Sequence, residues 1–343
     1  MRSVLVATAL WAFATASGAT AQIPALDRPA MAVRSPERTV LLAASLAGPR
    51  VVVVGERGIV ALSDDEGRTW RQAKTVPVSV TLTAVQFLDA KRGWAVGHGG
   101  VILHSQDGGE TWTRQADGRS LAKASVADGA SQAAHGIQPM VPDEPLFDVR
   151  FADAKRGYVV GAYNLAFETL DGGSTWTNIR HRIDNPKGSH LYSVAIRGDS
   201  IYIVGEQGVM FHSRDRGSSF MSMSAAYRGS WFSVVPVDER GLVAAGLRGN
   251  AAYSPDEGKT WHPIPGAPQA TLVAGFRIGT GNLLLANQAG QLLTTRAGAA
   301  FEAVRLPSPL PPPAGLLPLS DGALLVVGLT GAIRLRAPEF SFR

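Results

Sequence analysis

An eight-residue motif with the pattern Ser/Thr-x-Asp-x-Gly-x-Thr/Ser-Trp/Phe recurs along this chain. The complete copies are Ser63–Trp70, Ser105–Trp112, Thr169–Trp176, Ser213–Phe220 and Ser254–Trp261. The range Thr294–Phe301 retains the glycine and the aromatic residue but has Arg296 in place of the aspartate, so we interpret it as a decayed sixth copy. In this motif, known as the Asp box, the carboxylate can accept hydrogen bonds from N–H groups of its own turn, and glycine supplies a positive φ. Each copy therefore predicts a tight turn between two β-strands.

The spacing of the repeats predicts the architecture. The aromatic residues that end the motifs follow one another at intervals of 42, 64, 44, 41 and 40 residues. A second marker, an apolar run that ends in Gly or Asn, keeps the same period and occurs seven times, at Gly55, Gly97, Gly161, Gly205, Gly246, Asn287 and Gly328. A period in the low forties is typical of propeller blades. We therefore predict an all-β fold, a seven-bladed β-propeller with four-stranded antiparallel blades, in which the long interval reflects an insertion at residues 117–145.

The N-terminus predicts export from the cytoplasm. Residues 1–21 contain a basic Arg2, an apolar stretch over Val4–Ala14 and the sequence Ala19-Thr20-Ala21, which is typical of a signal-peptide cleavage site. The apolar stretch is shorter than the roughly 20 residues that a membrane-spanning helix needs. We expect a periplasmic protein with a leader at residues 22–38, a propeller at 39–337 and a C-terminal tail at 338–343.

Charge and composition exclude several classes of site. The chain has no Cys, which excludes disulfides, a lipid-modified cysteine and Cys-ligated metals. Its seven His show no ligand spacing, and two of them, His104 and His212, are expected to cover neighbouring Asp-box turns. A net charge of +5, or +4 without Arg2, is too small to indicate nucleic-acid binding. We expect a monomer without a metal or cofactor and without stable membrane insertion.

Two further segments bear on how the ring closes. The seventh unit supplies strands only over Ala323–Leu335, so we expect a strand within Met31–Leu42 to complete the last blade and cover its edge. The proline-rich range Leu306–Leu316 predicts a stiff, extended spacer between two blades.

The order of turns predicts a binding face. In a meandering blade alternate turns lie on the same face, so the Asp boxes share one face and the turns after the seven Gly or Asn markers share the other. The second set of turns supplies the candidate binding residues Glu56, Arg57, His98, Tyr163, Asn164, Glu206, Gln207 and Arg248. Because a guanidinium suits carboxylates, we expect an acidic segment of a client protein to dock between Arg57 and Arg248, with Tyr163 and the insertion near His135 along one wall. The alternative is that these turn residues are polar only because water surrounds them.

The second repeat resembles a known family. The run Ala95-Val96-Gly97-His98-Gly99-Gly100-Val101-Ile102, the Asp box Ser105–Trp112, and the preceding Phe87–Trp94 with its echo Phe151–Tyr158 are similar to the photosystem II stability/assembly factor-like family. The resemblance covers Val40–Leu335 and implies a secreted seven-bladed propeller, which in oxygenic phototrophs is a lumenal factor that helps to assemble a membrane protein complex. It implies a non-enzymatic protein whose partner is a membrane or extracytoplasmic protein.

Sialidases and other Asp-box glycosidases are the rival interpretation. Sialidase chemistry needs three arginines around the substrate carboxylate and a tyrosine nucleophile. Phe276-Arg277-Ile278 resembles the arginine motif of those enzymes but is followed by Gly279 instead of proline. The candidate carboxylates of the binding face, Glu56 and Glu206, belong to distant blades. We therefore favour a binding or assembly factor without catalysis, with a sialidase-like or other glycan-binding or glycan-cleaving propeller as the alternative.

Overall fold

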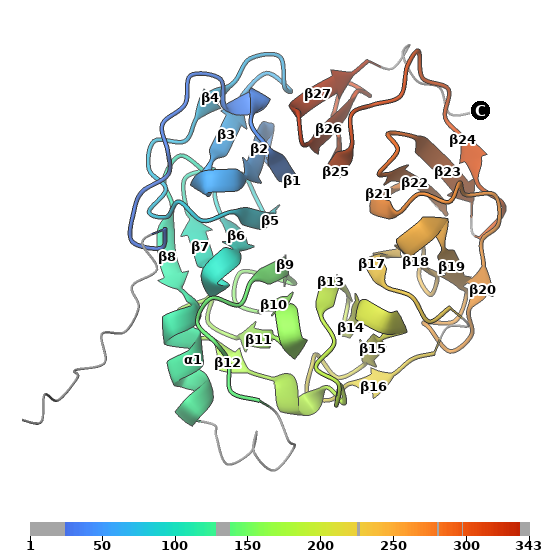
Figure 1. The fold of residues 1–343 in the computed structure, drawn as a ribbon, viewed down its shortest axis with the longest axis horizontal. Helices are drawn as coiled ribbons and strands as arrows, with labels where there is room; N and C mark the ends of the chain where they lie inside the picture. Colours follow the sequence, from blue (N-terminus) through green and yellow to red (C-terminus); the bar gives the residue numbers. More distant parts are fainter. Residues whose placement is uncertain (1–24, 128–137, 225–226, 280, 297, 337–343) are drawn as a thin grey trace, which may run out of the picture.

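Seven antiparallel sheets follow one another around a central channel (Figure 1). The structure is a computed structural model and describes residues 25–127, 138–224, 227–279, 281–296 and 298–336. The sheets are consecutive in sequence, and the first strand of each lies against the first strands of its neighbours around the ring. The predicted seven-bladed β-propeller is therefore confirmed.

The strand boundaries are as follows. Blade 1 consists of β1 (Leu41–Ala47), β2 (Arg50–Gly55), β3 (Val60–Ser63) and β4 (Arg71–Gln72), and blade 2 of β5 (Leu82–Phe87), β6 (Gly93–Gly97), β7 (Ile102–Ser105) and β8 (Thr113–Ala116). Blade 3 consists of β9 (Leu146–Phe151), β10 (Gly157–Gly161), β11 (Ala166–Thr169) and β12 (Thr177–Asn178), and blade 4 of β13 (Leu191–Arg197), β14 (Ser200–Gly205), β15 (Met210–Ser213) and β16 (Met221–Ser222). Blade 5 consists of β17 (Trp231–Pro236), β18 (Leu242–Gly246), β19 (Ala251–Ser254) and β20 (His262–Pro263), and blade 6 of β21 (Leu272–Ile278), β22 (Asn282–Asn287), β23 (Leu292–Arg296) and β24 (Glu302–Ala303). Within the described range 298–336, blade 7 has three strands, β25 (Pro313–Pro318), β26 (Leu324–Gly328) and β27 (Gly331–Leu335).

The second strand of each blade forms the core between blades. Every residue of β6, β10, β18 and β26 is buried, because both faces of these strands pack against neighbouring blades. This burial explains why the second strands are continuous apolar runs, such as Val51–Val54, instead of alternating ones.

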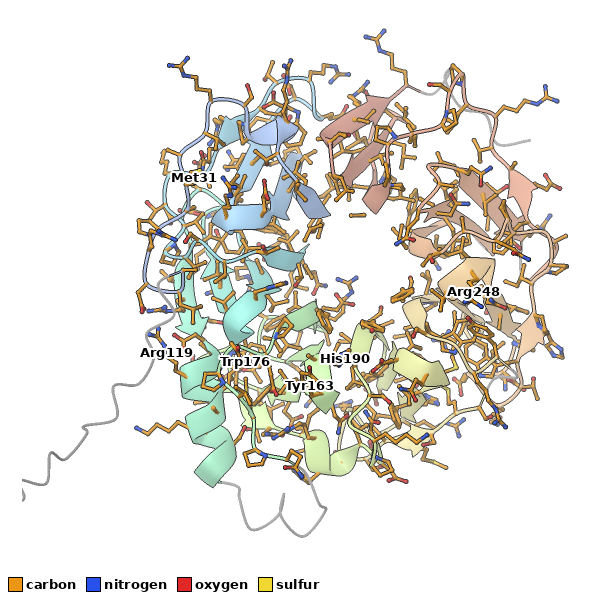
Figure 2. The ribbon with its side chains drawn as sticks, in the orientation of Figure 1. Met31, Arg119, Tyr163, Trp176, His190 and Arg248 are labelled. Atoms are coloured by element: carbon orange, nitrogen blue, oxygen red, sulfur yellow. The ribbon has the colours of Figure 1, made fainter. Side chains whose placement is uncertain are left out.

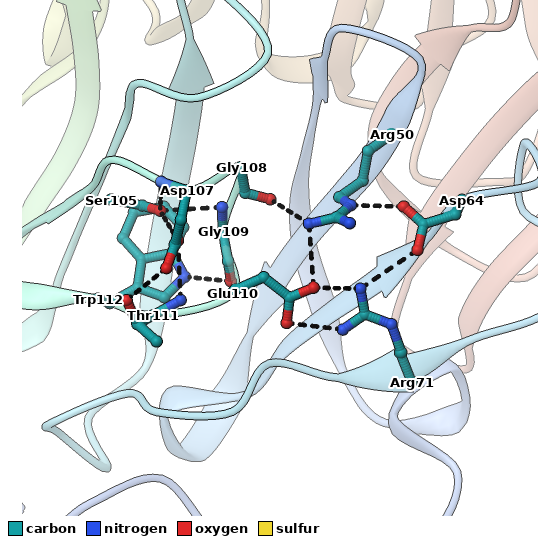
Figure 3. A network of polar contacts seen from close by, with 10 residues as sticks. All are labelled: Arg50, Asp64, Arg71, Ser105, Asp107, Gly108, Gly109, Glu110, Thr111 and Trp112. Atoms are coloured by element: carbon teal, nitrogen blue, oxygen red, sulfur yellow. Dashed lines mark hydrogen bonds and ion pairs between the residues drawn. The ribbon is translucent and has the colours of Figure 1, made fainter.

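The Asp boxes are self-contained turns (Figure 3). The Asp107 carboxylate accepts hydrogen bonds from the Thr111 N–H at 3.0 Å, the Thr111 hydroxyl at 2.6 Å and the Ser105 hydroxyl at 2.9 Å. Trp112 Nε1 donates to the carbonyl of Gly109 at 3.0 Å, and a Cβ at Gly109, where φ is 87°, would meet the side chain of Leu62 in blade 1 at 3.2 Å. The box therefore fixes its own turn and also packs against the preceding blade.

Ion pairs join blades 1 and 2 at the same level (Figure 3). Arg71 Nη1 lies 2.9 Å from Glu110 Oε2, and Arg50 Nη1 lies 3.2 Å from Glu110 Oε1. Both arginines also bind Asp64, so a carboxylate of each blade is shared by the same two guanidinium groups. The Arg71 guanidinium holds the pKa of Glu110 below its usual value.

Among the described residues, the ring closes by packing of blade 7 on blade 1 and not by a shared strand. The apolar side chains of Leu41, Val53, Leu325 and Val327 form one cluster between these blades, and Arg334 Nε donates to the Glu66 carbonyl at 2.9 Å. The prediction that a strand within Met31–Leu42 completes the last blade is wrong. Residues Pro36–Arg38 form a 3-10 turn, η1, and β1 begins at Leu41 as the inner strand of blade 1. The physical reason is a local turn, in which the Thr39 hydroxyl donates to the Pro36 carbonyl at 2.8 Å, so the segment touches blade 7 at Gly331 without forming a strand.

The N-terminal leader packs on blades 1 and 2. Leu26 is fully buried, and its side chain lies where a Cβ at Gly99 would meet it at 3.2 Å. The Ser79 N–H donates to the Ala25 carbonyl at 2.7 Å, and Asp27 binds Arg119 at 2.8 Å. Residues 25–38 are therefore part of the packed structure, while the predicted signal peptide and residues 22–24 lie outside the described residues.

The insertion begins with a helix that the sequence analysis did not predict. Helix α1 spans Gly118–Ala127, and Asp117 Oδ1 accepts hydrogen bonds from the N–H groups of Arg119 and Ser120 at its start. Leu121 is buried against blades 2 and 3. His135 and the predicted C-terminal tail lie outside the described residues. The proline-rich range was predicted as a spacer through Leu316, but its last part forms the inner strand β25.

None of the helices in the described ranges is long and apolar enough to cross a bilayer.

Candidate functional site

Five short turns mark one face of the propeller, which we call the turn face. They are the 3-10 turns η2 (Glu56–Gly58), η3 (His98–Gly100), η4 (Ala162–Asn164), η6 (Glu206–Gly208) and η7 (Leu247–Gly249), and each follows a Gly marker. All eight candidate binding residues lie in these turns. The middle residue has positive φ in each, at 54° for Arg57, 49° for Tyr163, 53° for Gln207 and 57° for Arg248.

The turns do not line the edge of the channel. Each connects the second and third strands of its blade, so it lies midway between the axis and the rim (Figure 1). Met31 of the leader covers Arg57, since its N–H donates to the Arg57 carbonyl and its sulfur lies 3.6 Å from Arg57 Nη1. Arg248 lies across the ring from Met31 (Figure 2). The structure therefore does not bring Arg57 and Arg248 together.

The other candidate residues differ in what they contact. His98 and Gln207 are exposed, and Glu56 is half-buried. Asn164 is buried, and its Oδ1 accepts a hydrogen bond from Asn185 Nδ2 at 3.0 Å. This bond joins turn η4 to the segment that contains Asn185. Glu206 Oε2 accepts the N–H of His190 at 3.2 Å.

The channel mouth is lined by a ring of β-bulges. Each inner strand begins with a residue paired to the Gly or Asn marker and then loses register for one residue, as between Leu41 and Ala43 in blade 1. The seven bulged residues are Leu42, Thr83, Phe147, Tyr192, Phe232, Val273 and Ala314. A bulge re-aims a side chain and is common beside functional sites. These positions, and not the turns, define the mouth.

Three consecutive blades place aromatic residues at this level. The ring centroids of Phe147 and Tyr192 are 5.5 Å apart, and those of Tyr192 and Phe232 are 4.9 Å apart. His190 lies 6.1 Å from both Phe147 and Tyr192 and 4.7 Å from Tyr163, each time edge to face (Figure 2). We call these five residues the aromatic arc. The facing bulge residues, Leu42, Val273 and Ala314, are smaller and aliphatic, so the mouth has one aromatic and one aliphatic side.

Hydrogen bonds fix the centre of the arc. His190 Nδ1 accepts the N–H of Tyr163 at 2.9 Å, which places the ring proton of the neutral imidazole on Nε2. Burial, and then the charge of Glu206, raise the pKa of Tyr192, so its hydroxyl stays protonated and can donate. The arc therefore combines apolar ring surface with hydrogen-bond donors.

A cavity of about 650 Å³ lies on the other side of Tyr163. Its walls include Glu144, Arg180 and Lys187. Glu144 is 9% exposed, and burial raises the pKa of its carboxyl. Tyr163, which is 58% exposed, belongs both to the arc and to the wall of this polar cavity.

A smaller cavity of about 290 Å³ lies deeper in the channel. It is lined by Arg150 and Arg277 together with Gln86 and Ser193. Arg277 is the residue of the sialidase-like motif. The cavity supplies two arginines from β9 and β21, whereas the sialidase clamp needs three.

The sequence analysis named Tyr163 but missed the other four residues of the arc. Its signal was an aromatic residue directly after the large apolar residue that opens an inner strand, as in Leu146-Phe147, Leu191-Tyr192 and Trp231-Phe232. That His104 and His212 cover Asp-box turns stays a prediction, and the structure adds that both stack on an aromatic residue of a neighbouring strand. Their ring centroids lie 4.7 Å from Trp94 and 4.4 Å from Tyr202. The reason is register, since each histidine is paired directly with that aromatic residue.

Comparison with solved structures shows the same fold in proteins with little sequence identity. A structure of YCF48 bound to a D1 peptide has a TM-score of 0.66 at 16% identity and covers 90% of this chain and 99% of that one. YCF48 from Cyanidioschyzon merolae has a TM-score of 0.66 at 15% identity, with 89% and 97% coverage. A streptogramin B lyase has a TM-score of 0.68 at 11% identity, with 90% and 96% coverage.

Sequence comparison identifies the family. The photosystem II assembly lipoprotein Ycf48 of Synechococcus sp. (strain CC9902) is 25% identical over 116 residues, which cover 33% of this chain and 35% of that protein. The chloroplastic photosystem II stability/assembly factor HCF136 of Oryza sativa subsp. japonica is 24% identical over 147 residues, which cover 41% and 35%. The matches thus span about a third of each relative. The family model described as photosynthesis system II assembly factor YCF48 matches residues 33–122 and 130–264, more than half of the sequence, so this chain belongs to that family.

Proposed function

We propose that this protein is a non-enzymatic factor that helps to assemble or stabilise a membrane protein complex, and that it holds an extracytoplasmic segment of its client at the turn face. The aromatic arc at the channel mouth, in a chain of this family, is the observation that carries the proposal. Its relatives are named as assembly factors, and one solved propeller of the same name is described as bound to a peptide.

The arc suits an apolar anchor of a peptide. Phe147, Tyr192 and Phe232 are each half-buried, so their positions are fixed before a ligand arrives while part of each ring is open. Aromatic residues supply much of the binding energy of protein interfaces because they bury large areas with few rotatable bonds. We infer that one apolar side chain of the client enters the mouth and packs on the arc.

The turn residues act around this anchor. We propose that Glu56, Arg57, His98, Gln207 and Arg248 set the polarity and charge that a client meets. Tyr163 belongs to the arc, and Asn164 and Glu206 lie beside it. Because Arg57 lies beside Met31, across the ring from Arg248, the two arginines attract an acidic segment at long range instead of clamping one carboxylate. This differs from a two-arginine clamp.

We propose a periplasmic location, supported by the signal-like residues 1–21 and by the description of the Synechococcus relative as a lipoprotein. Cell fractionation tests it. Recovery of the full-length protein in the cytoplasm would contradict export.

Site-specific photo-crosslinking tests the binding face. A photoreactive phenylalanine analogue is placed at Tyr163, which is 58% exposed on the turn face, or at Leu170, which is 57% exposed in the Asp box of the same blade. Irradiation in a native membrane fraction is followed by mass spectrometry. We expect membrane-protein adducts from position 163 and not from position 170.

The other outcomes are equally informative. Adducts from position 170 alone would place the client on the Asp-box face and contradict the proposal. Adducts from position 163 that contain only envelope glycan would favour the glycan-binding alternative, since aromatic rings with nearby donors also bind sugars.

A further inference from the structure

The two outer strands of blade 4 gather sulfur and imidazole on one face. The chain has six methionines, of which Met210 lies in β15, Met221 lies in β16 and Met223 directly follows β16. His212 of β15 is paired directly with Met221 of β16, and the Met223 N–H donates to the Met210 carbonyl at 2.8 Å. Directly paired residues share a face, and so do residues two apart on a strand. The side chains of Met210, His212, Met221 and Met223 therefore lie on the same face of blade 4.

A cavity of about 410 Å³ opens beside these side chains, between blade 4 and the Asp box of blade 5. His212, Met221 and Met223 line it. The Met223 thioether packs directly against Gly258, because a Cβ at position 258 would lie 2.1 Å from Met223 Sδ. Met210 is 1% exposed and belongs to the core beneath.

Gap filling explains only some of these methionines. Methionine is a flexible residue that fills irregular cores, which accounts for Met210 and part of Met223. Met221 is 72% exposed, so it fills no core gap. Solvent exposure alone would favour a polar residue at position 221, so the methionine there needs another explanation.

Stacking and a hydrogen bond fix the imidazole ring of His212. Its ring stacks on Tyr202, and its Nε2 lies 3.1 Å from Ser200 Oγ. When Nε2–H donates to this hydroxyl, Nδ1 carries the free lone pair, which matches the arrangement of metal-binding histidines.

The charges around the cavity are balanced. Arg214 lies 3.7 Å from Glu257, and Lys259 is also in the wall. The Asp215 carboxylate accepts hydrogen bonds from Ser213 at 2.7 Å and Ser219 at 2.6 Å. A monovalent cation in the cavity would therefore lie near two carboxylates, Asp215 and Glu257, and two cationic side chains, Arg214 and Lys259.

We propose that Met221 Sδ, Met223 Sδ and His212 Nδ1 bind a soft monovalent metal ion, Cu(I). Thioether ligands select Cu(I) over harder ions, and imidazole also binds copper. Among the described residues no group of three His, Asp or Glu could hold a metal, so selectivity for harder ions has no basis at this site. The inference is independent of the client-binding proposal, because this face is at the outer strands and not at the channel mouth.

Methionine-methyl NMR tests the site directly. The secreted form is labelled at the methionine ε-methyl carbons and titrated with Ag(I), a redox-stable substitute for Cu(I). We expect the Met221 and Met223 signals to shift and saturate at one equivalent, with Met31 and Met140 unchanged. Shifts confined to Met31 or Met140, or no shift at all, would overturn the proposal.

Competition for Cu(I) gives a second measurement. Under anaerobic conditions with bathocuproine disulfonate as competitor, Met221→Leu/Met223→Leu should weaken Cu(I) binding by at least about 10-fold. The matched control Met31→Leu/Met140→Leu should bind like the wild type. The single variant Met221→Leu changes an exposed side chain and keeps the fold, so it separates lost ligation from lost folding. Equal Cu(I) affinity of the wild type and both Met221 variants would rule the site out.

Discussion

At the scale of single residues, the turn face stores backbone strain. Arg57, Tyr163, Gln207 and Arg248 adopt a left-handed conformation that bulky residues rarely take. Glycine would fit these positions without strain, as Gly99 does in η3 with φ of 66°. Residues held in such conformations cluster at functional sites. The side chains, rather than the stability of the turns, therefore account for the choice of residue.

Tyr163→Gly separates binding from stability. Relief of strain and the added flexibility of the unfolded chain oppose each other, so we expect the free energy of unfolding to change by no more than about 1 kcal/mol. Client capture should fall because the exposed ring of the arc is lost. Urea unfolding and pull-down from membrane extract measure the two effects, with Arg216→Gly, at a position of positive φ in an Asp box, as the control. Unchanged capture would remove Tyr163 from the site.

Asp107→Ala tests the structural role of the Asp box. The change removes the acceptor for the Thr111 N–H, so we expect a loss of about 1–3 kcal/mol in the free energy of unfolding and no change in client affinity. Denaturant unfolding measures it against Gln106→Ala, an exposed neighbour. A stable variant that fails to bind would make the boxes part of a binding site.

The two stacked histidines predict a dependence of stability on pH. Burial lowers the pKa of His104 and lowers that of His212 to about 4. Below about pH 6.5, these two histidines therefore bind protons in the unfolded chain but stay neutral in the folded chain. The free energy of unfolding should therefore fall as pH drops from 6.5 towards 4. In His104→Gln/His212→Gln this fall should be smaller, as measured by urea unfolding at each pH. Parallel curves for the variant and the wild type would contradict the assignment.

At the scale of elements, repetition made the strands predictable. Each of the seven Gly or Asn markers is the last residue of the second strand of its blade, from Gly55 of β2 to Gly328 of β26, because the same apolar run and turn recur in each unit. The helix α1 and the packing of the leader occur once, so no repeat revealed them. The bulges that build the arc were also missed, since a bulge depends on the pairing of two strands and leaves no local pattern.

Leu26→Ala tests whether the leader is part of the fold. The side chain is fully buried against blades 1 and 2, so its truncation should cost about 2–5 kcal/mol. Chemical unfolding compares it with Arg28→Ala, an exposed change in the same segment. Equal midpoints for Leu26→Ala, Arg28→Ala and the wild type would show that the leader adds no stability.

At the scale of the whole molecule, the ring decides which residues meet. Phe147 and Tyr192 come from successive repeats and approach because blades 3 and 4 are neighbours, while Arg57 and Arg248 belong to blades 1 and 5. The sequence predicted the number of blades and the face of each turn. It did not predict the distance of each residue from the axis, which depends on where along a blade the turn lies.

Arg57→Ala and Arg248→Ala test long-range attraction. Since the two side chains lie across the ring, their effects on the free energy of client binding should add, whereas a shared clamp would give a non-additive double variant. We expect weaker capture and a smaller dependence on salt in the double variant. Titration at two ionic strengths measures both. Full capture with unchanged salt dependence would assign these arginines to the solvated surface.

The contact between the first and last blades can form only late in synthesis of the chain. β25 follows β1 by more than 260 residues, and at about 5–20 residues per second that interval lasts on the order of 10 to 50 seconds of synthesis. Until then the apolar face of blade 1, with Leu41 and Val53, has no partner. A newly made chain therefore passes through an incomplete ring in which this apolar face stays exposed until the last blade packs against it.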